Sequence, residues 1–324
     1  MKNQFHSFIL YVGLVFIGLT LATTSIQAQT KHPSYLEAQK SLEKKNYSQA
    51  LKEITVALES DLKEYDYWFL KTQILSQMGD ALAALDVFNK MVDKYPNESR
   101  VYFDRGNFLT SIRMAEPAVQ DFEKGISLNP VDSLIIPFYL NCGSARIYYR
   151  DFKGAYADFR QAYNKDSSNV SVLNNLGMVA QEIGKEDEAI YYMNKIIELD
   201  PKFLGGYVNL GYLYQLKGDF QKSVNYLDHA LQLDPNEALA LNNRGYSKLK
   251  LGDLKGALAD VKKSKKLYPG NAYAYRNLGL IHLSQSKNDE ACKAFYEALD
   301  KEFTKQYGNE VINLIKENCR NYRR

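Results

Sequence analysis

Apolar residues in segment 204–237 recur at helical spacing in two short runs. Each run covers one face of an α-helix, with members at or near positions i, i+3, i+4 and i+7. The first run is Tyr207, Leu210, Gly211 and Tyr214, and the second is Val224, Leu227, Ala230 and Leu231. Between them lies Gly218-Asp219; glycine can end a helix in the left-handed conformation, and aspartate caps the next helix. The pattern predicts a hairpin of two amphipathic helices.

The same pattern recurs every 34 residues along most of the chain. The recurrent glycines are Gly143, Gly177, Gly211, Gly245 and Gly279, and each is followed by a small residue twelve positions later. Because one hairpin cannot bury its apolar face alone, neighbouring hairpins must stack into a solenoid. The step from Gly106 to Gly143 is three residues longer, with the insertion near residues 133–135. We expect a longer loop there, and a re-aimed binding surface is the alternative.

An early unit carries Trp68, Ala84, Phe88 and Pro96 at the same relative positions. Together with the Leu-Gly and Tyr positions of segment 204–237, these residues resemble the tetratricopeptide repeat family. The resemblance implies an all-α fold, a right-handed α-solenoid superhelix of about eight helix-turn-helix repeats that holds other proteins. The units are 31–64, 65–98, 99–132, 136–169, 170–203, 204–237, 238–271 and 272–305. Residues 306–324 lie outside this period and are expected to form a polar-faced C-terminal capping helix.

The start of the chain has the pattern of a secretory signal peptide. Lys2 precedes an uncharged apolar run from Phe8 to Ala22, and small residues lead to Ala28. We expect a signal peptide over residues 1–28, cleaved after Ala28, because a membrane anchor needs about 20 apolar residues. We therefore expect an exported protein of bacterial type, periplasmic or secreted, with no transmembrane segment after cleavage.

The chain has three cysteines. Cys142 stands beside Gly143, at an expected core position of a first helix, where a small apolar role is typical. Cys292 lies on the second helix of the last unit, and Cys319 lies on the cap. Exported proteins can keep disulfides. A Cys292–Cys319 bridge that fastens the cap is one expectation, and two free thiols are the other.

An asparagine recurs two residues before the glycine in five consecutive units. These are Asn141, Asn175, Asn209, Asn243 and Asn277, with Asp104 at the same position of unit 99–132. The resemblance implies that this position faces the concave groove of the superhelix. A carboxamide both donates and accepts hydrogen bonds, so such a ladder could pair with the backbone of an extended peptide. The alternative is that the asparagines are only repeat consensus. Other residues expected in the groove are Tyr148, Met178, Tyr212, Tyr246, Lys250 and Arg276.

Composition removes several classes of function. Basic residues number 41 and acidic residues 38, which is too balanced for a dedicated nucleic-acid binder. The four histidines and three cysteines do not have the spacing of metal ligands. The sequence has no phosphate loop and no nucleophile elbow, so we expect no metal, no cofactor and no catalytic residues.

The leading hypothesis is a non-enzymatic scaffold or adaptor that binds an extended peptide or partner segment in its groove. Its 25 tyrosines suit a recognition surface, because tyrosine gives a large contact at low entropic cost. A self-assembling structural component of the cell envelope and an enzyme acting on envelope glycans are the alternatives. The partner, the process and the oligomeric state are left open by the sequence.

Overall fold

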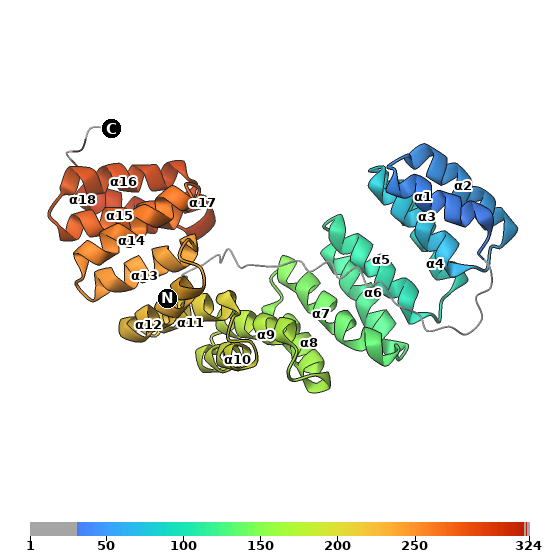
Figure 1. Cartoon of the computed structure of the whole chain (residues 1–324), viewed down its shortest axis with the longest axis horizontal. Coiled ribbons are helices and arrows are strands. Elements are labelled where there is room, and N and C mark those ends of the chain that lie inside the picture. Colours follow the sequence, from blue (N-terminus) through green and yellow to red (C-terminus); the bar gives the residue numbers. More distant parts are fainter. Residues whose placement is uncertain (1–30, 321, 323–324) are drawn as a thin grey trace. The chain divides into compact units, whose positions relative to one another are not determined.

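The computed structural model describes residues 31–320 and Tyr322, which form helices joined by short turns (Figure 1). The predicted signal peptide, residues 1–28, lies outside the described residues and stays a prediction. The described chain divides between Val172 and Leu173 into an N-terminal and a C-terminal unit. Within each unit the helices follow one another as hairpins, and the described residues include no strand. The predicted all-α fold of repeated hairpins is confirmed.

In both units, odd-numbered helices up to α15 are the first helices of hairpins and even-numbered helices are the second. The N-terminal unit contains α1 (Pro33–Glu43), α2 (Tyr47–Ser60), α3 (Tyr65–Gln77), α4 (Ala81–Lys94), α5 (Ser99–Ser111), α6 (Ala115–Ser127), α7 (Asp132–Tyr148) and α8 (Phe152–Lys165).

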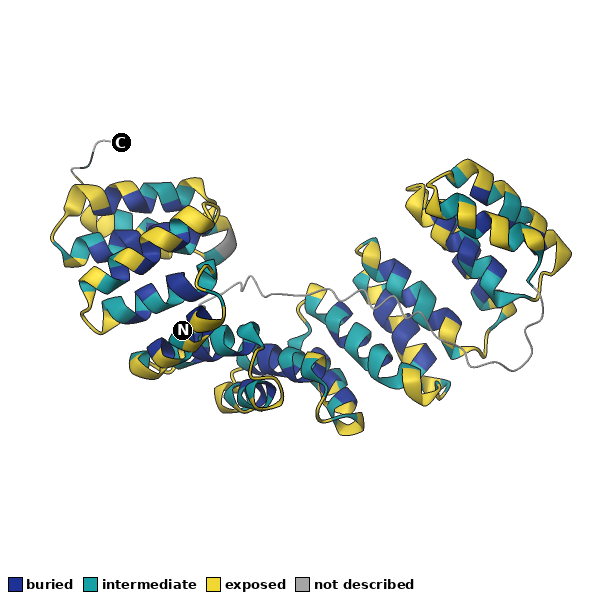
Figure 2. Cartoon of the chain, in the orientation of Figure 1, coloured by how far each residue is buried: buried dark blue, intermediate teal, exposed yellow. Residues whose placement is uncertain are grey.

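The C-terminal unit continues the series and ends with two shorter helices. Its helices are α9 (Val170–Glu182), which begins just before the boundary, α10 (Glu186–Leu199), α11 (Leu204–Leu216), α12 (Phe220–Leu233), α13 (Ala238–Lys250), α14 (Leu254–Leu267), α15 (Ala272–Ser284), α16 (Asn288–Asp300), α17 (Phe303–Tyr307) and α18 (Glu310–Asn318). Figure 2 shows buried residues on the sides where helices face one another and exposed residues at the turns.

The recurrent glycine is the point of closest approach within a hairpin. A Cβ atom on Gly279 would lie 2.3 Å from the Phe295 ring, and one on Gly211 would lie 2.4 Å from Leu227. Ala291, twelve residues after Gly279, is fully buried. Two small positions on facing helices therefore let a large apolar side chain fill the space between them.

The turn inside a hairpin is built as the sequence predicts. Gly218 has a φ of +77°, a conformation that other residues adopt only with strain. The carboxylate of Asp219 then accepts a hydrogen bond from the N–H of Lys222 at 3.1 Å, which satisfies a free donor at the start of α12. The same aspartate cap begins α4, α8 and α14.

The three residues inserted near 133–135 lengthen a helix, so the expectation of a longer loop was wrong. α7 has 17 residues, whereas α5 has 13. The added turn gains stability from Leu134, which packs against the core cluster that contains Phe138 and Cys142. Pro137 consequently lies inside α7 instead of at its start.

A buried arginine clamp ties first helices to second helices in two of the hairpins. Arg244 donates from Nε and Nη2 to the carboxylate of Asp260 at 2.8 and 2.6 Å, and from Nη1 to Asp228 of the preceding second helix at 2.7 Å. Lys248 adds a contact to Asp260 at 2.8 Å. Asp260 is only 6% exposed, so its charge depends on these partners. The equivalent clamp of the N-terminal unit joins Arg105 to Asp121 and Asn89.

The C-terminal segment packs against the last hairpin as one more first helix would. Glu310 forms an ion pair with Arg276, and the ring of Tyr307 lies 4.4 Å from that of Tyr273. Both pairs join residues that are 34 positions apart. The segment therefore continues the repeat register, contrary to the expectation that it lies outside the period.

Polar residues at two packing positions end the stack at α18. The positions 34 residues after Tyr275 and Gly279 hold Asn309 and Asn313, and both are exposed. Asn313 places a polar side chain at the position that glycine occupies in the preceding hairpins of the C-terminal unit. The exposed face of α18 is therefore hydrated instead of stacked, as a solenoid end requires.

A disulfide joins Cys292 of α16 to Cys319 at the end of α18. Both cysteines belong to the core cluster of the last hairpin, and the cap contributes Val311 to the same cluster. The remaining cysteine, Cys142, is fully buried, and burial raises the pKa of its thiol. Cys142 is thus a core residue with little thiolate at neutral pH.

The contribution of the clamp to stability can be tested with substitutions that occur naturally in the next hairpin. At the positions of Arg244 and Asp260, that hairpin has Leu278 and Ala294. Arg244→Leu or Asp260→Ala alone should cost roughly 2–4 kcal/mol, because each leaves a buried charge without its main partner. The double variant should recover to within about 1 kcal/mol of the parent. Urea unfolding of all four proteins measures this, and losses that simply add would contradict the clamp.

The disulfide predicts that the purified chain, digested without reductant, yields a cross-linked peptide containing Cys292 and Cys319. Replacing both by serine should lower the stability of the cap by roughly 3 kcal/mol, because the closed loop restricts the unfolded chain. Hydrogen exchange of α18 amides measures the loss, and Cys142→Ala provides a comparison outside the cap. Free thiols at both positions in the unreduced protein would rule out the bridge.

Candidate interaction surface

The residues predicted to bind a partner lie on equivalent positions of the first helices, which we call the ladder face. Its members are Asp104, Asn141, Tyr148, Asn175, Asn209, Tyr212, Asn243, Tyr246, Lys250, Arg276 and Asn277. The first three belong to the N-terminal unit and the others to the C-terminal unit. Met178, also expected there, is buried.

In the N-terminal unit, Asp104 is held between two hairpins. Its Oδ2 accepts a hydrogen bond from the Tyr65 hydroxyl at 2.6 Å and lies 3.7 Å from Nε of Arg100. The Arg100 guanidinium also lies over the Tyr65 ring, 4.6 Å from its centre. Burial raises the pKa of Asp104 to about 6, although Tyr65 and Arg100 act to lower it. Asp104 is therefore a link between α3 and α5.

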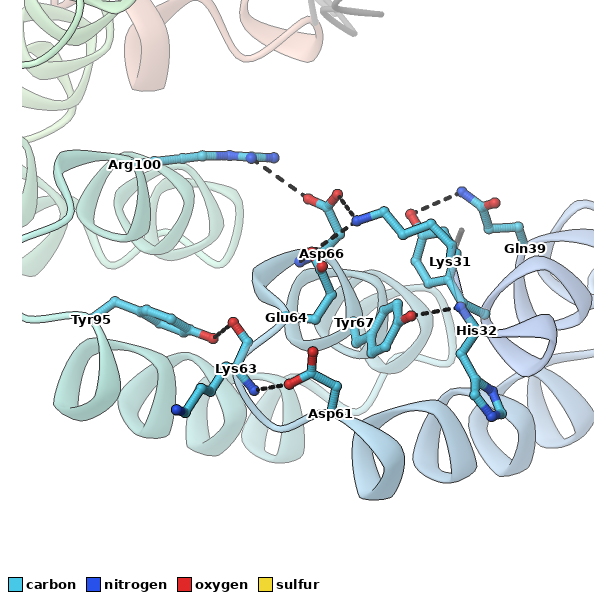
Figure 3. Close-up of polar contacts among 11 residues, drawn as sticks. Lys31, His32, Gln39, Asp61, Lys63, Glu64, Asp66, Tyr67, Tyr95 and Arg100 are labelled. Carbon is cyan, nitrogen blue, oxygen red and sulfur yellow. Dashed lines mark hydrogen bonds and ion pairs between the residues drawn. The ribbon is translucent and has the colours of Figure 1, made fainter. Parts of the chain in front are cut away.

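Ion pairs extend this link to the segment before α1, as Figure 3 shows. Lys31 Nζ lies 2.8 Å from Glu64 Oε1 and 2.9 Å from Asp66 Oδ2. The other oxygen of Asp66 lies 3.6 Å from Nη1 of Arg100. Burial acts to lower the pKa of the Lys31 ammonium, but Glu64 and Asp66 raise it above its ordinary value. Alternating charges thus connect three consecutive hairpins, a network that the sequence analysis missed.

Three of the five ladder asparagines bond to an asparagine of the preceding hairpin. The donor–acceptor pairs are Asn141–Asn107 at 2.6 Å, Asn277–Asn242 at 3.0 Å and Asn209–Asn174 at 3.5 Å. Asn277 is only 2% exposed, so its amide is not available to a peptide, and its expected groove role is wrong. The missed signal is the paired asparagines at 174–175 and 242–243.

Asn175 and Asn243 are the ladder asparagines of the C-terminal unit that are partly exposed and do not bond to an asparagine of the preceding hairpin within the described chain. Asn243 is positioned by two contacts. Its side-chain oxygen accepts from Asn242 at 3.4 Å, and its backbone carbonyl accepts from Gln215 at 2.6 Å. These two side chains are the ladder amides best placed to meet a partner.

At the far end of the ladder face, two cations flank the ring of Tyr246. The Arg276 guanidinium carbon lies 4.9 Å from the ring centre, and Lys250 Nζ lies 5.4 Å from it. Arg276 also donates to Asn277 at 2.7 Å and pairs with Glu310. Arg276 is thus already bonded within the fold, and Lys250 is the exposed cation of the group.

The remaining two tyrosines differ in accessibility. Tyr148, near the end of α7, is 62% exposed. Tyr212 is mostly covered, and burial raises the pKa of its hydroxyl, with smaller contributions from Tyr273 and Glu182. Tyr148 can therefore contact a partner directly, whereas Tyr212 contributes mainly to packing.

The described residues include no group of three or more His, Cys, Asp and Glu side chains that could hold a metal ion. None of the described helices has the length and apolar character needed to cross a membrane. The chemistry of the ladder face is therefore that of amides, tyrosine hydroxyls and a few cations, which form reversible hydrogen bonds and ring contacts.

Comparison with known proteins agrees with this geometry. Models of the tetratricopeptide repeat match residues 170–203, 204–237 and 244–306. These segments are tetratricopeptide repeats. The chain is also 27% identical over 149 residues to tetratricopeptide repeat protein 6 of Homo sapiens; the match covers 44% of this chain and 28% of that protein's length.

Two solved structures share the fold. The Cut9–Hcn1 hetero-tetramer structure matches 90% of this chain and 57% of its own, with a TM-score of 0.57 and 19% identity. The C-terminal part of a repeat-containing protein from Cytophaga hutchinsonii matches 75% of this chain and 97% of its own, with a TM-score of 0.55 and 18% identity. At these identities the likeness concerns the fold alone.

Asp104 makes the N-terminal unit sensitive to pH. Because the pKa of Asp104 is raised by folding, the unfolded chain loses this proton first, and stability should fall as the pH rises from about 4 to about 6. Asp104→Asn should remove this fall and stabilise the protein at neutral pH by about 2 kcal/mol. The amide keeps an acceptor for Tyr65, and asparagine already occupies this position in later units.

Thermal unfolding of the parent and of Asp104→Asn between pH 4 and pH 8 measures this difference. Asp66→Asn is the matched control, because it removes a carboxylate that is paired with Lys31, and it should lower stability at neutral pH. A parent and an Asp104→Asn curve that run parallel over the whole range would contradict the assignment.

Proposed function

We propose that this chain is an exported, non-enzymatic scaffold that binds an extended segment of a partner protein along its ladder face. The observation that carries the proposal is the partial exposure of Asn175 and Asn243, on the first helices of the two repeats that flank repeat 204–237, with Tyr246 and Lys250 on the same helix as Asn243. Tetratricopeptide repeat proteins in general serve as protein-interaction scaffolds, which supports the same class of function.

The chemistry of the face favours recognition of a peptide backbone. A carboxamide offers one acceptor and two donors, which match the N–H and C=O of an extended chain. In the C-terminal unit, Tyr246 adds an amphipathic ring that can contact side chains with little loss of entropy. A partner segment held in this way is selected partly by its shape and only partly by its sequence.

Some ladder asparagines also join neighbouring hairpins, and this allows binding and stability to be tested separately. Asn141 and Asn209 join neighbouring hairpins, so alanine at these positions should reduce stability. Asn175 and Asn243 do not make such bonds within the described chain, so alanine there should leave stability nearly unchanged. Binding and stacking can therefore be separated by choosing which asparagines to replace.

The experiment begins by finding the partner segment. A photo-reactive residue placed at Tyr246 captures neighbours in intact cells, and mass spectrometry identifies the captured peptide. Calorimetry with the synthetic peptide should show at least about tenfold weaker binding to Asn175→Ala/Asn243→Ala. The control Asn141→Ala/Asn209→Ala should melt at a lower temperature but, where folded, bind the peptide as the parent does.

A backbone-methylated version of the peptide provides the decisive comparison. Methylation removes N–H donors without changing the side chains, so recognition through amides predicts a loss of affinity for the parent and almost no further loss for the Asn175→Ala/Asn243→Ala variant. Equal binding of both peptides by the parent would refute the role of the ladder in peptide recognition.

A further inference from the structure

The hairpin formed by α13 and α14 differs in charge from its neighbours. Segment 238–271 has eight basic and two acidic residues, whereas segment 170–237 has five basic and ten acidic residues. Because the repeats share one fold, the neighbouring hairpins show what packing alone requires. The excess of positive charge in this hairpin is therefore a departure that stacking does not explain.

Three of these eight basic residues form a stripe on the exposed side of α14. Lys255, Lys262 and Lys266 stand at positions i, i+7 and i+11 of the helix, and all three are exposed. The stripe spans about 16 Å at 1.5 Å per residue. Only Ala259 interrupts it, at position i+4, and this small residue leaves the stripe accessible.

At the equivalent positions of the flanking second helices, Lys293 of α16 is the single basic residue, and it stands where α14 has Ala259. In α10 they hold Asp187, Tyr191, Asn194 and Glu198; in α12 they hold Gln221, Asn225, Asp228 and Gln232; and in α16 they hold Asp289, Lys293, Tyr296 and Asp300. In the N-terminal unit, α8 carries Lys153 and Arg160 at two of these positions, and Arg160 lies over the Tyr163 ring at 5.7 Å.

Two other lysines of α14 serve the fold, which sets them apart from the stripe. Lys263 donates to the backbone carbonyl of Pro235 at 2.7 Å, and Lys265 pairs with Glu297 of α16 at 2.7 Å. In the described chain, Lys255, Lys262 and Lys266 have no carboxylate partner within ion-pair distance. Their charges remain available to a partner.

Local stability disfavours this arrangement. Lys255 lies in the first turn of α14, where the helix dipole favours an acidic residue, and α10 and α16 have Asp187 and Asp289 at the same position. Lys262 and Lys266 are four residues apart, a spacing at which like charges repel. The helix dipole favours only Lys266, in the last turn. Lys255 in the first turn and the repulsion between Lys262 and Lys266 weaken the helix slightly, and this cost points to a role outside the fold.

We propose that the exposed lysine stripe of α14 docks a short acidic segment of a partner protein. The stripe is one helix wide, and at the equivalent positions the second helix α16 carries Asp289 and Asp300. These carboxylates would repel a broad anionic surface such as a membrane or a long duplex, whereas a narrow acidic segment can follow α14 alone. The site is separate from the ladder face, because it lies on a second helix.

The test uses the purified chain and a dye-labelled peptide with glutamates at the spacing of the three lysines. Binding should be lost with a glutamine version of the peptide and should weaken with salt. The Lys255→Glu/Lys262→Glu/Lys266→Glu variant should bind at least about tenfold more weakly than the parent. The same variant should melt near the parent temperature, because the three side chains are exposed. The gain from an acidic residue in the first turn of α14 offsets the cost of two like charges near its end.

The matched control reverses the charge of three exposed lysines of the N-terminal unit. This variant, Lys44→Glu/Lys52→Glu/Lys124→Glu, changes the net charge by the same amount. It should keep full affinity for the glutamate peptide. The proposal is overturned by equal losses in the two triple variants, by equal binding of the glutamate and glutamine peptides, or by no binding. Tighter binding of a short DNA duplex, or of vesicles containing phosphatidylserine, would also overturn it in favour of a different partner.

Discussion

The close approach of two helices at the recurrent glycine is the constraint on which six of the eight hairpins depend, and the first two have Ala38 and Thr72 at that position. At Gly279 the facing helix brings the Phe295 ring into the space that a side chain would occupy. The hairpin is thin as a result, and its second helix turns an apolar side toward the next first helix. Stacking is then the way to bury that side, because two helices of this length cannot enclose a core between them. The glycine that brings two helices of a hairpin together thus also makes the stacking of neighbouring hairpins necessary.

The features that repeat could be predicted from the sequence, because each is a local rule applied many times. Gly218-Asp219 identifies a turn by its backbone conformation and its cap, and no distant residue is needed to recognise it. The first residue of α7 could not be predicted by such a local rule, because Pro137 lies inside this helix. A proline favours a helix start, yet the packing of Leu134 extends the helix by a further turn. Tertiary burial outweighed the local signal, which a single sequence does not reveal.

The ladder face shows the same division between what could and could not be predicted. The recurrence of asparagine is visible in the sequence, but the partner of Asn277 is Asn242, 35 residues earlier and one position off the ladder. A periodic search finds residues that share a position, and it misses bonds between neighbouring positions of successive repeats. The ladder amides consequently differ in what they bond. Some join the hairpins, whereas Asn175 and Asn243 make no such bond within the described chain and are partly exposed.

Because the hairpins share one fold, a residue can be compared with the residues at the equivalent position of the other hairpins. The pairing of Arg244 with Asp260 recurs as Arg105 with Asp121, in a different unit and with the same geometry, so packing accounts for it. Lys255 has a basic counterpart in Lys153 of α8, but α10, α12 and α16 have no basic residue at this position, and the helix dipole disfavours a lysine there. A residue that departs from the repeat and also weakens its own helix calls for an explanation outside the fold. The ladder asparagines follow the repeat and the α14 lysines depart from it, so two kinds of argument lead to two separate surfaces on one scaffold.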